Sequence, residues 1–168
     1  MESKITFTVP APQEGAAKKL PNLYATIGYS ANALSSYLAF VQAQAKGTFH
    51  AKEREAVYLI VSQLNGCEYC LASHTQSAIR MGWTEEETLS LRKGNFAGNK
   101  WPVIYKAIAS VIANKGEVND DLIHEFYDLS YGEKALIDLM TLISIMSYTN
   151  YVFRLTKIPI DFPAARPI

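Results

Sequence analysis

Apolar residues recur at spacings of three and four in three consecutive segments of the chain. The first segment lies before Gly47, and its apolar positions are Leu34, Tyr37, Leu38 and Val41. The second runs from Val57 to Leu64 before Gly66, and the third runs from Cys67 to Met81 before Gly82. Because this spacing places apolar side chains on one face of a helix, we predict three helices. Gly82 suits the left-handed residue that often ends a helix.

The same spacing continues through the second half of the chain. Thr84 and Glu87 form a capping-box pattern, which predicts the start of a short helix. Further helices are expected over residues 101–114, 119–129 and 133–155. The last of these is apolar nearly all round, so we expect it to be buried from several sides. No segment alternates apolar and polar residues as a strand would, and the pattern therefore predicts an all-α bundle of about six to seven helices.

Both ends of the chain lack this periodicity. Residues 1–29 predict an extended arm with room for a short turn of helix, because they contain helix-breaking residues at Pro10, Pro12, Gly15, Pro21 and Gly28. The closing residues 158–168 hold three prolines. A chain of 168 residues has the usual length of one domain. We therefore expect residues 30–168 to form a single all-α domain.

The composition narrows the choice of partners and compartment. The 16 Lys and Arg residues balance 16 Asp and Glu residues, so the chain lacks the charge expected of proteins that bind nucleic acids or anionic membranes. We find no targeting signal and no segment suited to cross a membrane, which predicts a cytoplasmic protein. Only 19% of residues are charged, and the apolar faces of the first and last predicted helices favour a homo-oligomer.

The chain contains two cysteines, Cys67 and Cys70, and both lie in the third predicted helix. Residues three and four apart on a helix are neighbours, so Cys67, Cys70 and His74 lie along one face. The Cα atoms of the two cysteines are then about 5 Å apart, which a disulfide permits. In a cytosolic protein such a pair is more often redox-active or metal-binding than a structural crosslink.

The position of this pair favours a reactive thiolate. Gly66 ends the preceding helix, so both cysteines lie near the N-terminus of their own helix, where free N–H groups and the helix dipole stabilise negative charge. An exposed dipole supplies about 0.3–1 kcal/mol, whereas lowering the pKa of a thiol from about 8.5 to about 7 needs roughly 2 kcal/mol. A proton acceptor must therefore help, and helical geometry brings His74 within reach. Glu55, near the start of the preceding helix, is the natural group to orient that imidazole and accept the relayed proton.

Other interpretations of these residues stay open. The two cysteines, His74 and Glu55 could form a tetrahedral zinc shell, although structural zinc usually takes its ligands from two separated pairs and the chain has no second CxxC. The cysteines could also be small core residues, and Glu55 could be an acid favoured by the first turn of its helix. We predict a redox role with no bound metal or cofactor.

The spacing of these residues resembles a known family. A glutamate twelve residues before a CxxC pair, with a histidine four residues after the second cysteine, is similar to the core of the alkylhydroperoxidase D (AhpD)-like branch of the carboxymuconolactone decarboxylase family. The stretch VSQLNGCEYCLASHT carries the resemblance, and Asn150 and the closing KIPIDFP are also similar. The resemblance implies an all-α fold that assembles into trimers or hexamers. It also implies a role for each of the four residues: Cys70 would be the peroxidatic thiol, Cys67 the resolving thiol, and Glu55 and His74 the proton relay.

The resemblance implies a thiol-dependent peroxidase that reduces organic hydroperoxides. The family's well-known peroxidase has a histidine between its cysteines, whereas this chain has Tyr69, a poor base near neutral pH. No third cysteine can reset the pair, so we expect an external dithiol protein as reductant. Organic oxidants rather than hydrogen peroxide are favoured by the apolar residues near the motif, which are Tyr58, Leu59, Leu71 and Ile79.

Two other functions are weighed beside the peroxidase. A redox-switched or disulfide-exchange protein would use the same cysteine pair without turning over peroxide. A lyase like the decarboxylase branch is less favoured, because its chemistry needs no CxxC and its carboxylate substrate calls for paired basic residues. Only Arg54 lies near the motif in the sequence.

Overall fold

The computed structural model describes residues 7–10 and 20–168, and these residues form eight α-helices and a 3₁₀ turn at Gln44–Lys46. No strand occurs in this part of the chain, so the predicted all-α fold is confirmed, with one helix more than the expected range. In chain order the helices are α1 (Asn22–Ile27), α2 (Ala31–Ala43), α3 (Ala51–Leu64), α4 (Glu68–Arg80), α5 (Glu85–Lys93), α6 (Lys100–Ala113), α7 (Asp120–Asp128) and α8 (Glu133–Thr156).

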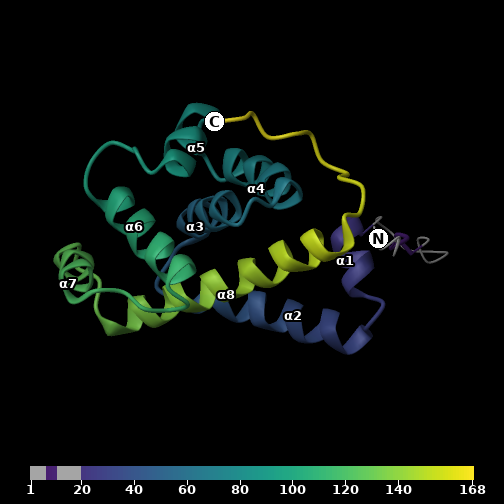
Figure 1. Cartoon of the computed structure of the whole chain (residues 1–168), viewed down its shortest axis with the longest axis horizontal. Helices are drawn as coiled ribbons and strands as arrows, with labels where there is room; N and C mark the ends of the chain where they lie inside the picture. The colour runs from purple at the N-terminus through teal and green to yellow at the C-terminus, as the bar shows by residue number, and fades with distance from the viewer. Residues whose placement is uncertain (1–6, 11–19) are drawn as a thin grey trace, which may run out of the picture.

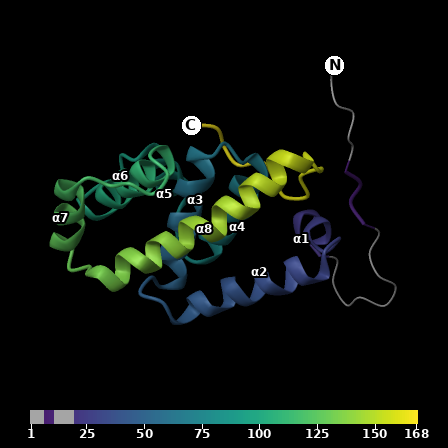
Figure 2. The same ribbon diagram turned by 60° about the horizontal axis from the view of Figure 1, so that its bottom comes forward.

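The longest helix, α8, runs through the middle of the molecule (Figure 1). The hairpin of α3 and α4 packs on one side of α8, and α2 lies along another side (Figure 2). After α8 the C-terminal tail returns across the molecule to α5 (Figure 1), where the guanidinium of Arg92 donates to the carbonyl oxygen of Arg166 at 2.7 Å. The tail is therefore held to the helical domain near its end as well as where it leaves α8.

Helix α8 differs from the sequence expectation in how much of it is buried. By length and composition it could cross a membrane, but in this fold Leu139, Leu142, Ile145 and Met146 are buried against other helices. Helices α1, α2, α3 and α4 all contact α8, as the predicted burial from several sides requires, but Ile137, Tyr151 and Leu155 remain more than half exposed, so the burial is incomplete within one chain. Leu38 and Phe40 of α2 are also exposed. The homo-oligomer that these apolar faces favour stays a prediction.

Local signals begin and end several helices where the sequence predicts. Thr84 and Glu87 make both hydrogen bonds of a capping box at the start of α5, at 2.8 and 3.1 Å. The side chain of Asn119 accepts a hydrogen bond from the N–H of Leu122 at the start of α7. Gly82 follows α4 with a φ of +91°, a conformation that side chains other than glycine rarely adopt. These boundaries depend on neighbouring residues, which is why the sequence alone predicts them.

The predicted N-terminal arm needs a correction. Within residues 1–29, residues Asn22–Ile27 form α1, and the side chains of Leu23 and Ile27 are buried in the core. The sequence allowed a short turn of helix here but not its burial, because six residues are too few to show periodicity. Other positions in the predicted arm, residues 1–6 and 11–19, lie outside the described residues.

Candidate active site

The turn between α3 and α4 positions the two cysteines. Gly66 has a φ of +63°, and the N–H of Cys67 donates to the carbonyl oxygen of Ser62 at 2.9 Å, as in the Schellman motif that ends many helices. Cys67 is consequently the N-cap residue of α4, and Cys70 lies in its first turn. The predicted placement of the pair at a helix N-terminus is therefore confirmed.

The two cysteines form a disulfide, but their surroundings differ. Their Cα atoms are 5.3 Å apart, and the backbone N–H of Cys70 donates to Sγ of Cys67 at 3.2 Å. Cys67 is fully buried, whereas Cys70 lines a cavity. A small molecule in this cavity therefore meets Cys70 and not Cys67.

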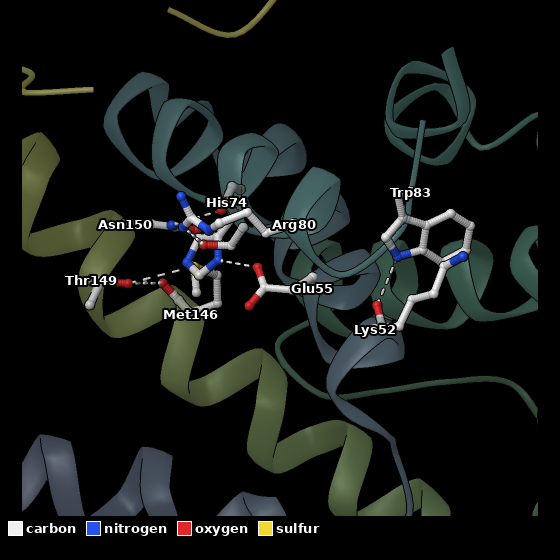
Figure 3. Close-up of polar contacts among 10 residues, drawn as sticks. Lys52, Glu55, His74, Arg80, Trp83, Met146, Thr149 and Asn150 are labelled. Atoms are coloured by element: carbon white, nitrogen blue, oxygen red, sulfur yellow. Dashed lines mark hydrogen bonds and ion pairs between the residues drawn. The ribbon is translucent and has the colours of Figure 1, made fainter. Parts of the chain in front are cut away.

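Glu55 and His74 meet across the α3–α4 hairpin (Figure 3). Oε2 of Glu55 lies 2.8 Å from Nδ1 of His74. A carboxylate accepts hydrogen bonds, so Nδ1 is the donor in this contact, and Nε2 is the other ring nitrogen that can exchange a proton. The ring of His74 also lies 5.0 Å from the ring of Tyr58, centroid to centroid. The structure thus contains the contact between acid and imidazole that the helical spacing predicts.

The cavity beside these residues has a volume of about 230 Å³. Glu55, Cys70 and His74 all line it. Five aromatic side chains, together with several aliphatic ones, form most of the remaining wall, and these are Tyr24, Tyr37, Tyr58, Tyr69 and Phe162. The site therefore combines a sulfur, a proton acceptor and a space shaped largely by rings.

Only one of the four apolar residues predicted around the motif lines this cavity. Tyr58 does, whereas Leu59 is fully buried in the core and Ile79 is 42% exposed. Leu71 is buried away from the cavity as well. The prediction was wrong for these three because closeness in sequence places residues on every face of a helix, and only one face of α3 and of α4 lines the cavity.

The tyrosine hydroxyls of the cavity remain protonated at neutral pH. Burial raises the pKa of Tyr24, Tyr37 and Tyr58 above the ordinary value of 10.0. The negative charge of Glu55 raises the pKa of Tyr24 and Tyr58 further. These side chains are hydrogen-bond donors rather than bases.

Tyr69, the residue between the cysteines, has a structural partner that the sequence did not reveal. Its hydroxyl donates to Oδ1 of Asp161 at 2.6 Å and accepts a hydrogen bond from the N–H of Leu23 at 3.1 Å. Burial and the hydrogen bond to Asp161 raise its pKa, so Tyr69 is no substitute for a histidine base. Asp161 lies in the KIPIDFP segment, which the sequence marked only as similar to the family, and 92 residues separate it from Tyr69.

A buried polar network ties the CxxC turn to α8. Asn150 is fully buried (Figure 3), and its amide nitrogen donates to Oγ of Ser62 at 3.3 Å. The amide of Asn65 donates to Oδ1 of Asn150 at 2.9 Å, and Arg154 donates to the carbonyl oxygen of Asn65 at 2.7 Å. The end of α3, from which the CxxC turn starts, is therefore fixed by polar groups inside an otherwise apolar helix pair.

The zinc shell considered from the sequence is not assembled in this structure. Among the described residues, no group of three or more His, Cys, Asp or Glu side chains is arranged to hold a metal ion. The sulfur atoms of Cys67 and Cys70 are joined to each other instead.

Comparison with known proteins identifies the family to which this site geometry belongs. Residues 31–112 match the carboxymuconolactone decarboxylase family. YdfG, an uncharacterized protein of Bacillus subtilis (strain 168), is 31% identical over 104 residues, which span 59% of this chain and 69% of YdfG. The matched residues include the whole α3–α4 hairpin and its cysteine pair.

Solved structures share the fold at low sequence identity. The debrominase Bmp8, in a complex with 2,3,4-tribromopyrrole, is 17% identical with a TM-score of 0.73, over 85% of this chain and 78% of Bmp8. An uncharacterized peroxidase-related protein from Silicibacter sp. TM1040 is also 17% identical with a TM-score of 0.73, over 83% of this chain and 75% of that protein. These likenesses show a common AhpD-like helical fold.

Proposed function

Because the chain belongs to the carboxymuconolactone decarboxylase family, we propose that it is a thiol-dependent peroxidase that reduces organic hydroperoxides through Cys67 and Cys70. One observation carries the proposal: Cys70 lines the same cavity as the hydrogen-bonded pair of Glu55 and His74. The attacking sulfur, a proton acceptor and space for the organic group of the oxidant lie together.

The first step oxidises Cys70. In the reduced protein His74 accepts the thiol proton of Cys70, and the carboxylate of Glu55 stabilises the imidazolium that forms. The thiolate attacks the outer oxygen of the hydroperoxide, so a sulfur–oxygen bond forms and the oxygen–oxygen bond breaks. The alkoxide leaves and takes the proton back from His74 as an alcohol, and Cys70 becomes a sulfenic acid.

The second step closes the disulfide. The sulfur of Cys67 attacks the sulfur of the Cys70 sulfenic acid, and water leaves. The N–H of Cys70, which points at Sγ of Cys67, favours the thiolate of Cys67 that this attack needs. An external dithiol protein then reduces the pair by exchange. In sum, one hydroperoxide and one dithiol become one alcohol, one water and one disulfide.

The cavity gives little support to the lyase. Arg54, the basic residue nearest the motif in sequence, donates to the backbone carbonyl oxygens of Phe49 and Gln44. None of the described residues that line the cavity is Lys or Arg. A carboxylate substrate would therefore find no fixed cation there.

A second candidate function follows from the aromatic wall beside Cys70. Bmp8 is a debrominase seen with a brominated pyrrole, and the cavity of this chain presents aromatic rings next to its cysteine pair. In such a reaction a carbon–bromine bond would break, bromide would leave, a proton would take its place, and the dithiol would supply two electrons and become a disulfide. Release of bromide from 2,3,4-tribromopyrrole by the reduced protein would test it.

Direct trapping of the oxidised sulfur tests the peroxidase. Reduced, metal-stripped Cys67→Ser protein is exposed briefly to one equivalent of cumene hydroperoxide with a sulfenic-acid trap, and the adduct is located by mass spectrometry. We expect the adduct on Cys70, and a Cys67–Cys70 disulfide in wild type treated in parallel. The opposite result would be an unmodified Cys70 in Cys67→Ser, together with a wild type that still forms its disulfide when treated with an oxidised dithiol. That result would reject the peroxidase in favour of disulfide exchange or a redox switch.

A further inference from the structure

We propose that the cavity selects hydroperoxides whose organic group is one compact aromatic ring, and that Tyr69 sets this preference by holding α1 and the C-terminal tail in place as a wall. The inference rests on the proposed peroxidase function and specifies its substrate class. It also gives a role to Tyr69, which the catalytic steps do not use.

The size and lining of the cavity suit a single substituted ring. A cavity of about 150 Å³ in another protein binds benzene, so a cavity of about 230 Å³ has room for a ring with a short branched substituent. Tyr24 and Tyr37 already meet edge to face at 5.9 Å between ring centroids, which is a favourable arrangement of aromatic neighbours. A long-chain fatty-acid hydroperoxide exceeds this space, so most of its chain would lie outside the cavity and away from the ring-lined wall.

The wall opposite the α3–α4 hairpin comes from two segments far apart in the sequence. Leu23 and Tyr24 of α1 line the cavity from one segment, and Phe162 lines it from the tail. The two segments are joined by Asn22, whose backbone N–H donates to Oδ2 of Asp161 at 3.0 Å and whose amide donates to the carbonyl oxygen of Pro159 at 3.1 Å.

The hydroxyl of Tyr69 links this wall to the CxxC helix. It binds the N–H of Leu23 and the carboxylate of Asp161 at once, and the ring packs on Phe153 and Phe162 at 5.6 Å between centroids. Helix α1 has six residues and no side-chain N-cap, so it cannot hold its own position by helical hydrogen bonds alone. Loss of the hydroxyl would leave the ring packing in place but remove the two hydrogen bonds that tie both wall segments to α4.

Tyr69→Phe tests the proposal by steady-state kinetics with three oxidants: cumene hydroperoxide, linoleic acid hydroperoxide and hydrogen peroxide. For wild type we expect kcat/KM to be at least about tenfold higher with cumene hydroperoxide than with the fatty-acid hydroperoxide. In Tyr69→Phe the ratio of kcat/KM for cumene hydroperoxide to that for hydrogen peroxide should fall about five- to tenfold, through KM rather than kcat. Tyr131→Phe is the matched control, because its hydroxyl faces Glu53 away from the cavity.

A second variant separates this role from a general loss of structure. Asp161→Ala should change the same ratio, and combining it with Tyr69→Phe should change the ratio by less than the two single effects together, because the two substitutions remove one shared hydrogen bond. Equal losses with all three oxidants, additive effects of the two changes, or a wild type that prefers the fatty-acid hydroperoxide would each overturn the proposal.

Binding without turnover keeps this test independent of the peroxidase. The oxidised protein is titrated with 2-phenyl-2-propanol, the alcohol formed from cumene hydroperoxide, and the Kd is measured by NMR. We expect binding to wild type and a Kd raised about five- to tenfold in Tyr69→Phe, the same factor as for KM. If the Kd is raised as expected but no hydroperoxide is turned over, the peroxidase function is rejected and the preference of the cavity is kept. If hydroperoxides are turned over but the Kd is the same in both proteins, the peroxidase function is kept and the preference of the cavity is rejected.

Discussion

Glu53 and Glu55 are two residues apart on α3, and their surroundings differ in the way that separates a structural acid from the proton-relay acid that we propose. Their side chains are almost equally exposed, at 18% and 16%, so burial does not distinguish them. Glu53 pairs with Lys100, whereas Glu55 pairs with His74 beside a cavity and a disulfide. The partner and the adjacent space therefore decide the role of each acid.

The region around Glu53 is filled by six rings, here named the aromatic cluster: Phe49, Trp83, Phe96, Trp101, Phe126 and Tyr131. Two lysines close over these rings, with Lys52 at 4.4 Å from the Trp83 ring (Figure 3) and Lys100 at 5.3 Å from the Trp101 ring. Permanent cations on packed rings stabilise a fold but move no proton near neutral pH. The cavity region has rings too, but they surround open space and an imidazole.

Matched substitutions of the two acids should give the largest contrast. Glu55→Gln keeps a hydrogen bond to His74 but cannot stabilise the imidazolium, so turnover of cumene hydroperoxide should fall about 10²–10⁴-fold. Glu53→Gln should leave turnover nearly unchanged. Steady-state assays with excess dithiothreitol measure both. Similar losses in the two variants would erase the distinction between the acids.

Removing one ring of the aromatic cluster should separate stability from chemistry. Phe126 is fully buried, so Phe126→Ala should lower the free energy of unfolding by about 3–5 kcal/mol, measured by urea denaturation. The folded variant should still form the sulfenic-acid adduct on Cys70. Met81→Ala is the control, because Met81 is 47% exposed after α4, and it should change stability by less than about 0.5 kcal/mol. Loss of the adduct at full folding would mean that the two regions are coupled.

The network around Asn150 should affect both properties, because it joins the core to the CxxC turn. Asn150→Ala leaves the amide of Asn65 without its buried acceptor and should cost about 1–3 kcal/mol in unfolding free energy. Turnover should also fall in the folded variant, since the end of α3 is released. Ser147→Ala, which removes only a 3.3 Å contact with Asn65, should have a smaller effect on both. Unchanged turnover in Asn150→Ala would mean that this network stabilises the fold but does not affect the active site.

The pair of Glu53 and Lys100 should give the smallest effect, and one that depends on pH. Burial opposes its charge, but hydrogen bonds from Lys100 and from the His50 N–H lower the pKa of Glu53 below its ordinary value. The charged pair therefore stabilises the fold above the unfolded pKa of about 4.3, and this contribution is lost as the pH falls through the lower folded value. Lys100→Met should cost about 0.5–1 kcal/mol at pH 7, because the lysine is partly exposed.

Denaturant titrations at pH 7 and pH 3 check this dependence. The difference between wild type and Lys100→Met should shrink at the lower pH, because the stabilisation from the lowered pKa of Glu53 is lost progressively as the pH falls below the unfolded value. In a Glu53→Gln background the same lysine substitution should have little pH dependence. A constant difference across the two pH values would assign the stabilisation to contacts of Lys100 with the rings alone.

The chemistry-bearing part of the molecule was predictable because its residues are close in sequence. Helical spacing and Gly66 placed Cys67, Cys70 and His74 on one face, and the length of the α3–α4 hairpin brought Glu55 opposite. These contacts span 3 to 19 residues. Local geometry is enough to bring such groups together.

The cavity was not predictable, because its walls come from both ends of the chain. Leu23 meets Tyr69 across 46 residues, and Asp161 meets it across 92. No periodicity in α1 or in the proline-containing tail encodes these contacts. From the sequence, Tyr69 was noted only because it stands where a histidine base is expected. In the fold its hydroxyl binds Leu23 and Asp161, which belong to the segments that form one wall of the cavity.

The same separation sets an order of events during protein synthesis. At about 5–20 residues per second, the ribosome needs roughly 5–20 s to add the residues between Tyr69 and Asp161. Throughout that interval the nascent chain carries its complete dithiol but lacks the tail that completes the wall. The wall of the cavity can thus close only after translation has passed Phe162, so both cysteines exist in the cell before the cavity that Cys70 lines is complete.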